Sequence, residues 1–158
     1  MMISNVKGDF GHITGSIEFD PANLAASRVE VSIDAATVST REPQGDKHLK
    51  SSDFLDVKRY PTMIFRSNRI ASTGANSYKL SGELTLHGVT REVTLDVESV
   101  TPEIKDPDGL LRRGASARTR IERRDFGLTW NAVLESGGFV VGDDVEVTID
   151  AELIRQPE

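Results

Sequence analysis

The sequence contains no cysteine, and only 6% of its residues are aromatic. The absence of cysteine excludes disulfide bonds, a cysteine nucleophile and cysteine-ligated zinc. Long hydrophobic runs are absent as well. The longest contain only a few apolar residues, as at Phe139–Val141, whereas a membrane-spanning helix needs roughly 18. We therefore expect no integral membrane segment.

No signal peptide is visible, because Met1–Gly8 lacks an apolar stretch of the needed length. The chain as written is therefore expected to be cytoplasmic. A true N-terminus further upstream would make a periplasmic location the expectation instead.

Basic residues are fewer than acidic ones, 19 against 25, which gives a net charge of -6. A nucleic-acid partner is not expected, because contact with phosphates requires a basic face. The one basic concentration runs from Arg112 to Arg124, and it is interpreted either as a solvated strand face or as a local anion site. The histidines are too dispersed for a metal site, and no phosphate-binding or dinucleotide-binding motif is present. We predict no metal and no cofactor.

Apolar and polar residues alternate along most of the chain. The pattern is clearest over residues 28–33, 78–86, 92–98 and 145–153, and a period of two indicates β-strands with one dry and one wet face. Turn residues separate these segments at strand-length intervals. The length of 158 residues suits one domain over 1–158. We predict an all-β fold of about eight antiparallel strands that close into a barrel, since closure removes exposed edges.

Two segments interrupt the alternation. Residues 46–56 predict a short helix followed by a loop, and one helical turn is expected around Ala25–Ala26. Residues 123–142 are long and irregular, with a helical turn or loop near 130–136. Loops of this length inside a small domain usually carry function or cover an opening.

Small residues occupy one face of the predicted strand near 114–121. Ala115, Ala117 and Thr119 share that face, and small inward residues leave room for one small ligand inside a narrow barrel. The alternative is that larger residues on the opposite wall fill the space.

Several motifs together resemble the YceI-like family of polyisoprenoid-binding proteins over essentially the whole chain and in the same order. The strongest is residues 46–57, DKHLKSSDFLDV, which is similar to the family's D-x-H-L-x-S-x-D-F-F-D signature. The others are residues 1–11, 15–20, 33–40, 60–65, 80–97, 124–131 and 141–145.

The resemblance implies an extended, lipocalin-like antiparallel barrel whose apolar cavity binds long isoprenoids without catalysis. Gly45 stands where the family usually has Arg, and Leu55 replaces the second Phe of the signature. The family also has a further strand before the segment that begins at Met1. We therefore expect either that this start is internal or that another chain supplies the missing pairing.

Candidate ligand-binding residues are mostly apolar side chains of the predicted strands and loops, and each is interpreted either as ligand contact or as ordinary core. His48 is interpreted either as a polar contact at the mouth of the barrel or as a brace for the short helix. Arg124, with Arg123, could receive a phosphate or pair with an aspartate such as Asp125. The full set is Phe10, Ile13, Ile17, Phe19, His48, Phe54, Leu55, Met63, Phe65, Arg124, Phe126, Leu128, Trp130 and Phe139.

The leading hypothesis is a non-catalytic carrier of a long apolar small molecule, such as a polyisoprenoid, an isoprenoid quinone or a related lipid. One alternative is a structural or protein-interaction barrel with a filled core, and a homodimer is left open. The other alternative is a hydrolase or isomerase that uses His48 with Asp46 or Asp53 as an acid–base pair.

Overall fold

The computed structural model describes residues 9–11, 13–20, 22–40, 42–130 and 143–155. Strands dominate these residues, as predicted. The strands are β1 (Asp9–Phe10), β2 (Ile13–Glu18), β3 (Arg28–Asp34), β4 (Val38–Ser39), β5 (Thr62–Gly74), β6 (Ser77–Leu86), β7 (Val89–Glu98), β8 (Ile104–Lys105), β9 (Leu111–Glu122) and β10 (Asp144–Ile154). The helical elements are η1 (Leu24–Ala26), η2 (Ala35–Thr37), α1 (Pro43–Lys50) and η3 (Arg123–Phe126).

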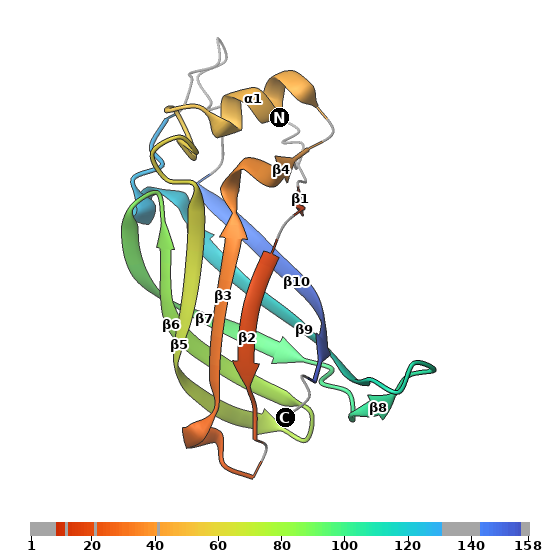
Figure 1. Cartoon of the computed structure of the whole chain (residues 1–158). Coiled ribbons are helices and arrows are strands. Elements are labelled where there is room, and N and C mark those ends of the chain that lie inside the picture. The colour runs from red at the N-terminus through yellow and green to blue at the C-terminus, as the bar shows by residue number, and fades with distance from the viewer. Residues whose placement is uncertain (1–8, 12, 21, 41, 131–142, 156–158) are drawn as a thin grey trace, which may run out of the picture.

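The main sheet is antiparallel and has the strand order β10-β9-β7-β6-β5-β3-β2, with β8 paired to β9. Figure 1 shows that this sheet curves strongly, with α1 above one end. No pairing between described strands joins β2 to β10. A barrel closes only when its two edge strands bond to each other, so the predicted closed barrel is not confirmed.

A short helix followed by a loop was predicted within residues 46–56, and only the start of the helix differs. Helix α1 begins at Pro43 and ends at Lys50, because proline suits the first turn of a helix. After it, Phe54 and Asp56 donate backbone hydrogen bonds to the Ser51 carbonyl and form turns. The expected turn around Ala25–Ala26 is confirmed as η1. The segment predicted near 130–136 lies outside the described residues except for Trp130, which is in no helix.

The long strand β5 bends by means of irregular pairing with β6. Its register shifts between Ser67 and Arg69 and again between Ser72 and Gly74. Gly82 of β6 lies opposite the first shift, where an added Cβ would come within 2.3 Å of the Arg66 carbonyl oxygen. Only glycine allows the two backbones to approach this closely.

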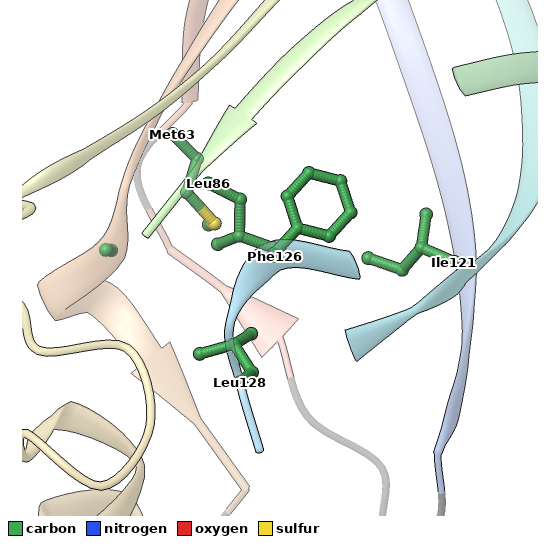
Figure 2. Packing of buried hydrophobic residues seen from close by; sticks show 6 residues of the cluster. Met63, Leu86, Ile121, Phe126 and Leu128 are labelled. Carbon is green, nitrogen blue, oxygen red and sulfur yellow. The ribbon is translucent and has the colours of Figure 1, made fainter. Parts of the chain in front are cut away.

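The core has two parts. The upper core lies at the end near α1 and contains Ala35, Met63, Leu86, Ile121, Phe126 and Leu128. Figure 2 shows the Phe126 ring between Leu86 and Ile121. The middle core contains Phe65, Leu80 and Leu95, with smaller neighbours around them. No helix of the described residues is long and apolar enough to cross a membrane.

Candidate ligand-binding site

The inner face of the curved sheet is mostly apolar. Residues opposite one another on paired strands share a face, so the register shows which side chains point inward with the core. The inward pairs include Ile13 with Ile33, Ile17 with Val29, Val31 with Phe65, Leu80 with Leu95, Val97 with Ala117 and Ile149 with Ala117. The alternation seen in the sequence thus produces one largely apolar face, on which the register also places Arg91, Arg113 and Thr119.

This inner face is buried in its middle and exposed at its two edges. Phe65 and Leu80 in the middle strands are buried, whereas Ile13 and Ile17 of β2 expose 54% and 39% of their surface. Val145 of β10 exposes 41%. Isoleucine and valine side chains are normally buried, so the two edges present apolar surface for which the described residues provide no cover.

The predicted small-residue stretch lies on this face. Ala115 is opposite Ala151, and Thr119 is opposite Val147. Ala117 lies between Ile149 and Val97. The pairing of Ala115 with Ala151 brings two small side chains together. At this position the adjacent strand therefore provides no large side chain to fill the space beside Ala115.

Several predicted ligand residues belong to the core. Met63, Phe126 and Leu128 are buried in the upper core, and Phe10 and Leu55 pack against it. Phe65 belongs to the middle core. For these residues the structure shows the packing role, and contact with a ligand stays a prediction. Phe139 lies outside the described residues.

Three aromatic rings cluster between α1 and the segment after η3. The His48 ring lies edge-on to Phe54 and Trp130, with centroids 5.0 and 4.6 Å away, and its Nε2 is 2.9 Å from Oδ2 of Asp53. Asp46 is engaged elsewhere, because its carboxylate accepts hydrogen bonds from the Thr40 hydroxyl and amide. The hydroxyl bond holds the pKa of Asp46 below its ordinary value. Of the two proposed acid–base partners, Asp53 is therefore the one in contact with His48.

The two arginines at η3 are held within the fold. Arg123 is buried, and its Nη1 donates hydrogen bonds to the carbonyl oxygens of Leu128 and Trp130 at 2.5 and 2.8 Å. Arg124 is more exposed, and its Nε lies 3.1 Å from Oδ1 of Asp143. Of the two interpretations of Arg124, the structure shows the ion pair, and the partner is Asp143 rather than Asp125.

A second side-chain cluster lies at the opposite end of the inner face, which we call the lower end. It contains Phe19, Tyr78 and Arg113. The Phe19 ring lies edge-on to Tyr78 with centroids 5.4 Å apart, and the Arg113 guanidinium carbon is 5.4 Å from the Phe19 ring centroid. The sequence analysis selected Phe19 but not its two partners. The register places both on the inner face, because Tyr78 lies opposite Val97 and Arg113 lies opposite Leu153.

Two open hollows lie away from the apolar middle of the inner face. One, of about 400 Å³, is lined by both polar and small residues: Ser99, Thr101, Gly114, Ala115, Ser116, Asp150, Ala151 and Glu152. The other, of about 300 Å³, is lined by Thr14, Ser32, Asp34, Pro61 and Thr62. The described residues contain no group of histidine and carboxylate side chains that could hold a metal ion.

The family model for the YceI-like domain matches residues 1–153. This chain belongs to the YceI-like family. The YceI-like protein is 35% identical over 149 residues to a UPF0312 protein of Azotobacter vinelandii, covering 94% of this chain and 74% of that relative. It is 37% identical over 125 residues to UPF0312 proteins of Vibrio cholerae, covering 79% of this chain and 66% of their length. It therefore spans just under two thirds of those relatives.

Solved structures agree with the family assignment. The YceI protein of Campylobacter jejuni superimposes with a TM-score of 0.86 at 32% identity, covering 99% of this YceI-like chain and 89% of that one. BcnA of Burkholderia cenocepacia gives a TM-score of 0.82 at 24% identity, covering 96% and 90%, and shows a likeness of fold alone. A polyisoprenoid-binding domain of Saccharophagus degradans gives 0.52 at 16% identity, covering 77% and 67%, and shows a likeness of fold alone.

Proposed function

We propose that this YceI-like protein binds a long apolar ligand against the inner face of its sheet and holds it without catalysis. The observation that carries the proposal is that the apolar side chains of Ile13, Ile17 and Val145 are exposed at the edges of a mostly apolar face. A ligand lying along this face would bury these side chains. A barrel that is closed around the ligand, and transport of the ligand, belong to the same proposal.

The energetics favour a hydrocarbon. Burial of one methylene is worth about 0.8 kcal/mol, so one five-carbon isoprene unit is worth roughly 3–4 kcal/mol before costs. The loss of ligand freedom offsets part of this gain. Several units in contact with the face would still bind tightly, with selection by length and width rather than by hydrogen bonds.

The predicted site residues divide into two roles in this proposal. Ile13, Ile17 and Phe19 contact the ligand directly because they lie at the exposed edge and lower end. The buried residues Phe65 and Met63 form the wall behind it. His48 is assigned the bracing role, through its side-chain contacts with Asp53, Phe54 and Trp130.

A polyisoprenoid is the first ligand to test, with an isoprenoid quinone as the second. The choice follows from the family resemblance and from the binding domain of the same fold described above. Because that likeness is one of fold alone, it only suggests which ligand to test first. The proposal that the ligand is apolar rests on the inner face of this chain.

The test compares inner-face variants with a matched exposed control. Ile13→Ser and Ile17→Ser replace exposed apolar side chains of the inner face. Ile104→Ser replaces an exposed isoleucine on β8, which pairs at the margin of the sheet. We expect the purified protein to retain a polyprenol in native mass spectrometry, the first two variants to retain at least tenfold less, and the control to match the wild type. Equal retention in all three variants, or no retention by the wild type, would contradict the proposal.

A further inference from the structure

Arg113 is the one arginine of β9 that faces inward. The strand carries four arginines, and Arg113 pairs with Leu153 on the face of Ala115, Ala117 and Ile121. Arg112, Arg118 and Arg120 alternate with these positions and face outward. A cation therefore lies at the lower end of an apolar face on which a ligand is proposed to lie.

Contacts across the sheet hold this cation over the face. Strands β3 and β5 lie between β2 and β6, so a flat sheet would separate β2 from β6 by about 14 Å. Phe19, which directly follows β2, nevertheless contacts Tyr78 of β6, and Arg113 stacks on the same Phe19 ring. The curvature of the sheet has brought the three side chains together, and the cation–π contact orients the guanidinium.

Among the described residues, no carboxylate forms an ion pair with Arg113. Its neighbours differ in this respect: Arg112 pairs with Asp106 and Glu152, and Arg124 pairs with Asp143. An apolar ligand that covered the lower end would remove water from the Arg113 guanidinium. A charge without water or a counterion is costly, so a ligand that brings its own anion is favoured over one that does not.

We propose that Arg113 receives the acidic head group of an amphiphilic ligand, either a carboxylate or a phosphate. The head lies at the lower end beside Phe19 and Tyr78, next to the small side chains Ala115 and Ala151, and the tail extends over the middle core toward α1. The guanidinium fork suits either anion through paired N–H donors. This inference rests on the proposed function, and it places the head at the end opposite to Arg124.

Three ligands with one sixteen-carbon chain test the head group: hexadecanol, hexadecanoate and hexadecyl phosphate. Delipidated full-length protein is titrated with each at neutral pH and at low and high salt. We expect the wild type to bind at least one of the anions about tenfold more tightly than the alcohol. The anion whose affinity exceeds that of hexadecanol by the larger factor identifies the head group as carboxylate or phosphate.

Variants of the protein show whether the preference for an anion depends on Arg113 or on positive charge in general. Arg113→Gln should bring the anion-to-alcohol ratio close to one while hexadecanol affinity stays within a few-fold. Arg113→Lys should keep part of the preference because it keeps the charge. Arg118→Gln is the matched control on the outer face of the same strand and should leave the ratio unchanged.

Each other outcome overturns the inference. Equal wild-type affinity for all three ligands would show that Arg113 does not select an acidic head group, while the proposed binding of an apolar ligand would remain supported. Loss of the preference in Arg124→Gln, but not in Arg113→Gln, would place the head at the upper end. Failure of the wild type to bind any of the three would overturn the proposed function together with this inference.

Discussion

Replacement of Arg123 by methionine should destabilise the protein strongly, although no ligand contact is assigned to this residue. Arg123 exposes only 3% of its surface. Its Nη1 bonds to the carbonyl oxygens of Leu128 and Trp130, and its Nη2 lies 3.8 Å from Oδ1 of Asp143. One side chain thus fastens η3 to the segment that follows it. Methionine preserves much of the apolar stem but none of the donors.

The magnitude follows from the two carbonyl groups that would lose their donor. A buried acceptor left without a partner costs about 1–3 kcal/mol. Leu128 is buried, so its carbonyl bears this cost, whereas Trp130 is only partly buried and its carbonyl can gain water. We expect Arg123→Met to lower the free energy of unfolding by about 2–4 kcal/mol.

Guanidinium unfolding followed by two signals provides the assay. Far-ultraviolet circular dichroism reports the sheet, and fluorescence of Trp130, the single tryptophan, reports the segment that Arg123 holds. Arg124→Met is the control, because Arg124 is 56% exposed and a surface ion pair is worth only about 0–1 kcal/mol. Equal losses in the two variants would refute the reasoning that the carbonyl bonds, rather than the charge, make Arg123 important.

Three further predictions concern other positions. Phe126→Ala should cost about 3–5 kcal/mol, measured by the same unfolding assay, because the ring is 1% exposed in the upper core. Gly88→Ala should cost about 1–3 kcal/mol, since φ is +72° and the new Cβ would lie 2.5 Å from Cε1 of Tyr60. Asp106→Asn should flatten the loss of thermal stability in acid, because the Arg112 guanidinium hydrogen bond lowers the pKa of Asp106. The carboxylate stabilises the fold above its ordinary pKa of 3.8, and this contribution disappears as the pH falls through the lowered value.

Each of these predictions has a control within the chain. Leu110→Ala removes a side chain that is 38% exposed and should change the unfolding free energy by about 0.5 kcal/mol or less. Gly109→Ala has a similar φ of +85° but no atom within 3.6 Å of the new Cβ, so it isolates backbone strain from the clash. Asp108→Asn removes a carboxylate from the same turn while leaving the Asp106–Arg112 contact in place, and serves as the control for Asp106→Asn.

The sequence was sufficient to predict the strands because their signal is local. Alternation over residues 28–33 and 145–153 gives an inward and an outward face without knowledge of partner strands, and β3 and β10 follow it. The family assignment was equally accessible, because its motifs occur in order along the chain. The start of the helix was predicted three residues too late, because Pro43 begins α1 ahead of the motif at residue 46.

The side-chain cluster at the lower end could not be predicted from the sequence, because its contacts are not local. Phe19, Tyr78 and Arg113 are separated by many residues, and the strands that carry or precede them, β2, β6 and β9, are not neighbours in the sheet. Their contact depends on the curvature of the whole sheet, which alternation does not encode. The charge run at 112–124 was equally ambiguous in sequence, because only the register of β9 shows that Arg113 faces inward while Arg112 faces outward.

The distribution of burial on the inner face separates folding from binding. Residues in the middle of the face, such as Phe65 and Leu80, are covered by the protein itself, so their apolar surface stabilises the fold whether or not a ligand is present. Ile13 and Ile17 still expose 54% and 39% of their surface, so the corresponding part of their hydrophobic free energy is gained only when a ligand covers them. The position of a side chain on this one face therefore determines whether its truncation lowers stability or affinity.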